Sequence, residues 1–198
     1  MTITSAVATH SGLRREGNED AYCVREDLGL YVVADGMGGH AAGEVASKLA
    51  VDTIEAVVHD TRGADVNSTW PFPYDMALSL NGNRLKAAIQ MANRRVTSAM
   101  QDNDALRGMA TTAAVILMHG QQGTLAHVGD SRAYRLRRGD LAPLTQDHSW
   151  VNDQVRSGLM TEDDARRHPW RNAVTRAISG GDDPEPDVAE LELQAGDR

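Results

Sequence analysis

Hydrophobic and polar residues along this chain follow two periodicities, one typical of helices and one typical of strands. In residues 43–59 and 83–100, apolar side chains recur three or four positions apart, which predicts two amphipathic helices. Residues 60–80 between them contain a glycine and two prolines, so we expect a long loop there. Two shorter helices are predicted at residues 150–158 and 161–167, the second beginning at a Thr-Glu-Asp-Asp cap.

Apolar runs of strand length flank this pair of helices. Residues 21–24 and 30–34, separated by a turn, predict a β-hairpin, and residues 2–9 are a weaker strand candidate. Further strands are expected at residues 111–118, 124–128, 132–137, 140–144 and 188–193. Strands on either side of a helix pair indicate an α+β layered domain.

An acid stands where the apolar run 30–34 ends. Asp35 is followed by the sequence Gly36-Met37-Gly38-Gly39-His40. A strand holds such a carboxylate rigidly, and glycines without a Cβ let the backbone bring its carbonyls close to a ligand. Hard cations such as Mg²⁺ and Mn²⁺ prefer a carboxylate beside an accessible carbonyl. The same residues are also typical of an ordinary Asp-Gly turn between a strand and a helix.

A second acidic cluster lies at the start of the predicted hairpin. Glu19 and Asp20 precede the strand 21–24, so a hairpin would place them beside Asp35 at one edge of a sheet, together with Arg15. Like charges held this close are unfavourable unless a cation neutralises them. The alternative is a solvated turn of mixed charge.

Four short motifs occur in an order that resembles a known enzyme family. They are Arg15-x-x-Asn18-Glu19-Asp20, Asp35-Gly36-Met37-Gly38-Gly39-His40, Gly108-Met109-Ala110-Thr111-Thr112 and Val128-Gly129-Asp130-Ser131-Arg132. With similar stretches at 145–149, 158–161 and 171–177, the chain resembles the bacterial metal-dependent serine/threonine phosphatases, the PPM or protein phosphatase 2C-like family. The resemblance implies one phosphatase-like domain over residues 1–198. Its fold would be an α-β-β-α sandwich of two mainly antiparallel sheets flanked by helix pairs, incomplete at the C-terminus.

The resemblance also implies hydrolysis of phosphoserine and phosphothreonine with two Mn²⁺ or Mg²⁺ ions and a third, weaker one. Asp35 is expected to bridge the two ions, with the Gly36 carbonyl as a further oxygen ligand. Asp20 and Glu19 are expected to orient metal-bound waters. Paired cations of this kind lower the pKa of a water and neutralise charge on the phosphoryl oxygens.

Three further residues receive roles by resemblance, and each has a structural alternative. Arg15 would bind two phosphate oxygens with its planar fork, or it is a surface arginine. Asp130 would hold the third metal, or it is a turn acid before a hairpin. His40 would act as general acid towards the leaving group, or it caps the following helix. The remaining histidines show no metal-ligand spacing and are expected to be structural or solvated.

The sequence departs from the family pattern after Ala195-Gly196-Asp197. Family members continue into a Ser-Asp-Gly-Leu motif and a later Asp-Asn motif, which both supply metal-binding aspartates, and neither motif is present in this sequence. We therefore expect a chain truncated before these motifs. The alternative to an active phosphatase is a catalytically impaired fragment or a regulatory binding module with the same fold.

Composition limits the classes of binding partner and the cellular compartments that we expect for this chain. The chain has 198 residues and a formal net charge of −8 without a basic stripe, which argues against nucleic-acid binding. No apolar run is long enough to span a membrane, and the first residues do not resemble a signal peptide. Cys23 is the single cysteine, which fits a reducing cytoplasm. We expect a cytoplasmic monomer that acts on phosphorylated proteins, including a serine/threonine kinase and its substrates.

Overall fold

The centre of the fold is an antiparallel sheet. The computed structural model describes residues 3–13, 17–39, 42–65 and 67–198. The strand order is β1-β2-β4-β5-β8, and β3 pairs with the end of β2. The strands are β1 (Asp20–Arg25), β2 (Leu30–Met37), β3 (Ala110–Thr111), β4 (Ala113–His119), β5 (Gln122–Val128) and β8 (Asp187–Glu192). The predicted hairpin is confirmed, because β1 and β2 pair along their whole common length.

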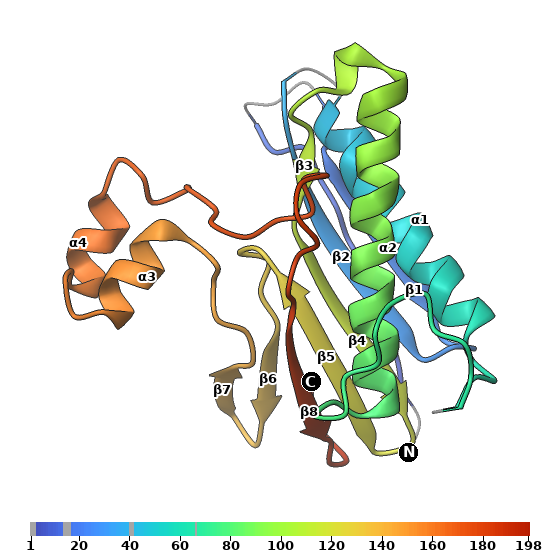
Figure 1. Ribbon diagram of the computed structural model, residues 1–198. Coiled ribbons are helices and arrows are strands. Elements are labelled where there is room, and N and C mark those ends of the chain that lie inside the picture. Colours follow the sequence, from blue (N-terminus) through green and yellow to red (C-terminus); the bar gives the residue numbers. More distant parts are fainter. Residues whose placement is uncertain (1–2, 14–16, 40–41, 66) are drawn as a thin grey trace.

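Two long helices cover one face of this sheet (Figure 1). They are α1 (Ala42–Asp60) and α2 (Leu80–Asp102), joined by residues 61–79, and a short 3-10 helix η1 (Asp104–Leu106) follows α2. Alternate residues of β2 are buried, as expected of a strand with one face against a core. The core forms between these buried residues and the apolar stripes of the helices, with Ile54, Leu85 and Ile89 fully buried.

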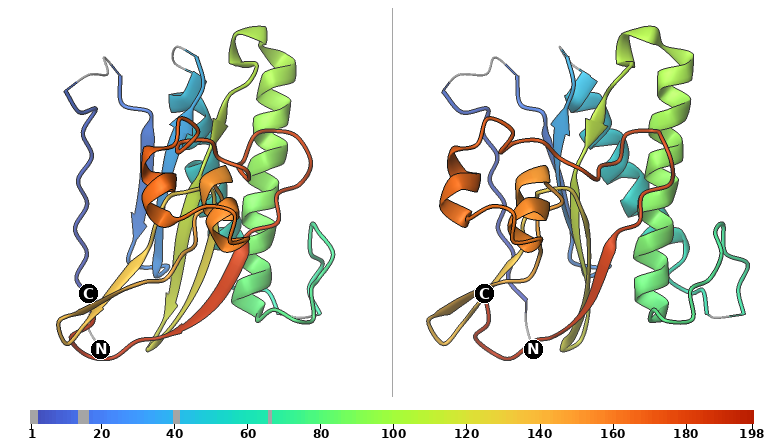
Figure 2. Two further views of the ribbon diagram at one scale, coloured as in Figure 1. Left: turned by 90° about the vertical axis from the view of Figure 1, so that its left-hand side faces the viewer. Right: turned by 60° about the vertical axis from the view of Figure 1, so that its left-hand side comes forward.

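The remaining elements lie on the opposite face of the sheet (Figures 1 and 2). A hairpin of β6 (Tyr134–Arg137) and β7 (Asp140–Pro143) is followed by α3 (Trp150–Arg156) and α4 (Glu162–Arg167). The order of layers is therefore helix pair, sheet and second sheet, in agreement with the expected sandwich, and the short helices α3 and α4 pack against each other beside them. In the described part of the chain the second sheet has two strands. No described helix has the length and apolar character needed to cross a membrane.

One predicted element is wrong. Of the strand candidate 2–9, residues 3–9 are described and form no strand. The segment instead runs beside β1 and is hydrogen-bonded through side chains to the residues that flank this strand (Figure 2). Ser5 Oγ donates to Glu26 Oε1 over 2.5 Å, and Asn18 Nδ2 donates to Thr9 Oγ1 over 2.6 Å. Alternation of apolar residues could not distinguish a tethered extended segment from a paired strand.

Candidate metal centre

Asp20 and Asp35 are direct cross-strand partners in the β1–β2 hairpin. Opposite residues of an antiparallel pair project from the same face, with Cβ atoms about 4.5–5.5 Å apart. Both residues are exposed. Two carboxylates held this close repel each other, and oxygen ligands arranged in this way suit a hard divalent cation. This pairing is compatible with the Mg²⁺ or Mn²⁺ site that the sequence predicted, and the ligand set stays a prediction.

Asp35 lies inside a paired strand rather than at its end. We expected the strand to stop at Asp35, but β2 continues to Met37. The extension forms because Gly36 and Met37 pair with Thr111 and Ala110 of β3. Asp35 is thus flanked by β1 on one side and by the β3–β4 segment on the other, which fixes its main chain more firmly than a strand terminus would.

Gly36 is required by a close approach of helix α1. A Cβ at this position would lie 2.0 Å from the carbonyl oxygen of Gly43 and 2.6 Å from that of Glu19. The Gly36 N–H donates to the Glu19 carbonyl over 3.0 Å. From the sequence we expected this glycine in a bending loop. The structure instead places it in an extended strand, where the missing side chain makes room for the first turn of α1.

Glu19 connects the hairpin to the start of α1. Its carbonyl accepts a hydrogen bond from Ser47 Oγ over 2.6 Å, in addition to the bond from Gly36. Its carboxylate lies at the first turn of α1, because a Cβ built on Gly43 would be 2.6 Å from Glu19 Oε1. A negative charge is favourable at this end of a helix. Glu19 therefore lies behind the Asp20–Asp35 pair and half-buried, where orientation of waters remains its predicted role.

The loop that carries Asp130 is attached to the main chain of Asp35. It follows β5, and Gly129 takes a φ of +102° that favours glycine. Ser131 Oγ lies 2.6 Å from Thr112 Oγ1, and Thr112 Oγ1 accepts a hydrogen bond from the Asp35 N–H over 3.0 Å. The fold therefore sets Asp20 opposite Asp35 and connects the residue after Asp130 to the main chain of Asp35. Arg15 and His40 lie outside the described residues, and their roles stay predictions.

A second titratable cluster was not found from the sequence. His127, His148 and Asp187 place one ligand atom each within 4.8 Å of one another. The imidazoles stack with centroids 4.5 Å apart, and His148 Nε2 lies 3.2 Å from Asp187 Oδ2 without the alignment of a good hydrogen bond. These residues are far apart in the chain and meet because β5 pairs with β8 in a register that opposes His127 and Asp187. Local spacing carries no signal for such a cluster.

The hydrogen bonds of this histidine cluster favour a structural role over metal binding. His148 Nδ1 accepts the Gly129 N–H over 3.1 Å, so the proton of the neutral ring sits on Nε2 and blocks that nitrogen. Burial lowers the pKa of His148, which keeps the ring neutral. The two ring planes differ by only 25°, whereas a metal bound to both must lie in the plane of each ring. The cluster therefore holds the loop after β5 in place.

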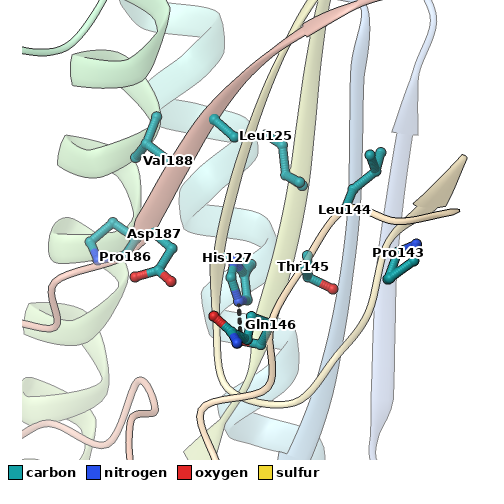
Figure 3. Close-up of a pocket in the computed structure, with 10 residues that line it drawn as sticks. Leu125, His127, Pro143, Leu144, Thr145, Gln146, Pro186, Asp187 and Val188 are labelled. Atoms are coloured by element: carbon teal, nitrogen blue, oxygen red, sulfur yellow. Dashed lines mark hydrogen bonds between the residues drawn. The ribbon is translucent and has the colours of Figure 1, made fainter. Parts of the chain in front are cut away.

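A cleft of about 800 Å³ opens beside the histidine cluster (Figure 3). It lies between β5, β8 and the segment that follows β7, and the His127 Nε2 contact with the Gln146 carbonyl, 2.9 Å long, forms part of its wall. None of the acids singled out in the sequence lines it. The cleft and the predicted metal centre are therefore different features of the molecule.

Comparisons with known proteins agree with the geometry. The profile of the protein phosphatase 2C family matches residues 10–178. The serine/threonine protein phosphatase PstP of Mycobacterium tuberculosis is 35% identical over 198 residues, which are 100% of this chain and 35% of that protein. The protein phosphatase PhpP of Streptococcus pneumoniae is 33% identical over 197 residues, covering 97% of this chain and 74% of that protein. The chain thus spans about a third of the length of the mycobacterial relative.

Solved structures give the same result. The crystal structure of M. tuberculosis PstP/Ppp superposes with a TM-score of 0.81 at 35% identity, covering 96% of this chain and 73% of that one. The catalytic domain of PstP in complex with two manganese ions gives a TM-score of 0.77 at 34% identity. The match covers 96% of this chain and 72% of that one. Fold, motif order and sequence identity agree over nearly the whole chain. The chain therefore belongs to the protein phosphatase 2C family.

Proposed function

We propose that this chain is a metal-dependent protein serine/threonine phosphatase domain that hydrolyses phosphoserine and phosphothreonine with Mn²⁺ or Mg²⁺. The observation that carries the proposal is the register of the hairpin, which sets Asp20 opposite Asp35 on one face of the sheet. The names of the relatives support an enzyme over a binding module, since PstP and PhpP are both named protein phosphatases. The two manganese ions of the related catalytic domain support the choice of metal.

Each residue of the proposed site would have a role in metal binding that follows from its position. Two bound cations would supply an activated water at neutral pH and neutralise charge on the phosphoryl group. Asp35 would hold both cations with the Gly36 carbonyl, since the two residues are adjacent in a strand fixed on both sides. Asp20 and Glu19 would orient waters from the neighbouring strand and from the first turn of α1. Asp130 would hold a third cation from the loop after β5.

The substrate side of the site rests on the motif match. Arg15 would bind the phosphate through two parallel N–H groups, and His40 would donate a proton to the leaving oxygen. The substrates would be phosphorylated proteins, among them a serine/threonine kinase and the proteins it phosphorylates. We propose a cytoplasmic, monomeric protein in which residues 1–198 belong to a single domain. The common core that the helices and the sheet share supports the last point.

The test is metal-dependent hydrolysis of a phosphothreonine peptide by the full-length protein, with Asp35→Asn as the decisive variant. A direct ligand should matter at least as much as an outer partner, so we expect a loss of about 100-fold or more. The control is Asp102→Asn, an exposed acid at the end of α2, which should retain activity. Phosphatase activity that survives complete chelation, or an Asp35→Asn protein as active as the control, would refute the proposal.

A further inference from the structure

The main chain of Asp35 is held by two threonines. Strand β2 pairs with β3 at Gly36 and with β4 at Val33, so Asp35 stands opposite Thr112 between the two ladders. The Asp35 N–H donates to the side-chain Oγ1 of Thr112 over 3.0 Å. The Asp35 carbonyl accepts from the Thr112 N–H and from Thr111 Oγ1, each over 3.0 Å. A side-chain oxygen therefore accepts the N–H of the residue predicted to bridge the metals.

The same hydroxyl reaches the loop of Asp130. Thr112 Oγ1 lies 2.6 Å from Ser131 Oγ, and the Thr112 side chain is almost fully buried, with an exposed fraction of 1%. A hydroxyl can donate one hydrogen bond while it accepts others. The Thr112 hydroxyl thus accepts a hydrogen bond from the Asp35 N–H and shares a second hydrogen bond with the Ser131 hydroxyl. One buried hydroxyl connects the strand of Asp35 to the residue next to Asp130.

The methyl group of Thr112 makes a separate contact with the same loop. A Cβ built on Gly129 would lie 2.5 Å from Thr112 Cγ2. Gly129 therefore packs directly against this methyl group. Threonine is the residue that supplies both groups from one Cβ, since serine lacks the methyl group and valine lacks the hydroxyl.

We propose that Thr112 is a positioning residue of the metal centre. Its hydroxyl orients the main chain of Asp35 and, through Ser131, holds the Asp130 loop at the same edge of the sheet. This inference rests on the proposed function, in which Asp35 and Asp130 are metal ligands. Residues that orient metal ligands typically change metal affinity by about 10- to 100-fold when they are removed. Thr112 would act in this way without touching a cation.

The experiment compares Thr112→Val and Thr112→Ser in the full-length protein, with Mn²⁺ binding measured by titration calorimetry. Valine keeps the shape but leaves the part-buried Asp35 N–H without its acceptor, so we expect Mn²⁺ affinity to fall about tenfold or more. Serine keeps the hydroxyl, so its affinity should stay within about threefold of the wild type. Thr53→Val is the matched control, because this buried threonine of α1 donates only to the Leu49 carbonyl in its own helix.

Ser131→Ala tests the second half of the connection. We expect it to weaken Mn²⁺ binding less than Thr112→Val does, and the double variant should bind no more weakly than Thr112→Val alone, because both changes break the same connection. Amide hydrogen exchange at Asp35 gives a readout independent of catalysis, and protection should fall in Thr112→Val but persist in Thr112→Ser. If Thr112→Val does not unfold cooperatively, Ser131→Ala carries the test.

Several outcomes would overturn the inference. One is unchanged Mn²⁺ affinity in a folded Thr112→Val protein. If Thr112→Val does not fold, unchanged Mn²⁺ affinity in Ser131→Ala has the same consequence. Another is an equal loss in Thr112→Ser and Thr112→Val, which would assign the effect to packing on Gly129. The control Asp35→Asn separates the two levels of the argument. Loss of Mn²⁺ binding in Asp35→Asn with full affinity in Thr112→Val overturns only the positioning role, whereas full affinity in Asp35→Asn overturns the proposed function and this inference with it.

Discussion

Replacement of Gly36 by alanine tests whether strand β2 and helix α1 are in contact beside Asp35. The added Cβ would lie 2.0 Å from the carbonyl oxygen and 2.5 Å from the carbonyl carbon of Gly43, and 2.6 Å from the carbonyl oxygen of Glu19. All three are main-chain atoms, so no side chain can rotate away. Either the first turn of α1 must move or β2 must leave its register with β1.

The cost follows from this geometry. An extra methyl group in a well-packed region typically costs about 1–3 kcal/mol of unfolding free energy. Because the contacts of Gly36 are with main chain and far below normal van der Waals distance, we expect a loss of about 3 kcal/mol. For a chain of this size each kcal/mol lowers Tm by roughly 2–4 °C, so Tm should fall by roughly 6–12 °C.

Thermal unfolding followed by circular dichroism measures this loss, with Gly63→Ala as the matched control. Gly63 lies in the loop after α1, and a Cβ there would have no described atom within 4 Å. Its Tm should stay within about 2 °C of the wild type. Mn²⁺ affinity should also fall in Gly36→Ala, since Asp35 is the preceding residue. A Gly36→Ala protein with the same Tm as the Gly63→Ala control would show that α1 does not approach β2 as described.

Two pH dependences follow from buried or paired groups. Arg137 donates two hydrogen bonds to Asp197 and holds the pKa of that carboxyl below its usual value. This stabilisation is present above about pH 3.9 and is lost as the pH falls. Plots of Tm against pH for the wild type and for Asp197→Asn should therefore converge towards about pH 2. Parallel plots would contradict this prediction. Burial lowers the pKa of His148, so protonation favours the unfolded chain below about pH 6.5. His148→Gln should flatten the decrease in Tm between about pH 7.5 and 5.5, and an unchanged slope would argue against this.

Local patterns in the sequence predicted most of the elements because these elements bury one face. The helices predicted at 43–59 and 83–100 extend over Ala42–Asp60 and Leu80–Asp102. The cap predicted at Thr161 is also confirmed, since its side chain accepts from the Asp164 N–H at the start of α4. Each of these signals depends on residues within one or two turns of each other. Such signals survive folding when no distant contact competes with them.

Features that depend on residues far apart in the chain could not be predicted from the sequence. The extension of β2 to Met37 depends on pairing with β3, more than 70 residues later in the chain. The histidine cluster depends on the register of β5 with β8, and the role of Thr112 depends on a hydrogen bond to the main chain of Asp35. A threonine that acts through a neighbour's amide group has no characteristic spacing. Its motif was visible in the sequence, but what its side chain binds was not.

The register that sets Asp20 opposite Asp35 is fixed by the turn at the other end of the hairpin. Side chains alternate between the two faces of a strand, so a slip of one residue would turn Asp20 towards the helices and away from Asp35. The tight turn between β1 and β2, with hydrogen bonds from Leu28 to Arg25 and from Gly29 to Glu26, sets the register. The close fit of Gly36 against α1 then prevents β2 from sliding. The pairing of Asp20 with Asp35 at one end of the hairpin, and with it the proposed metal centre, therefore depends on turn geometry at the other end.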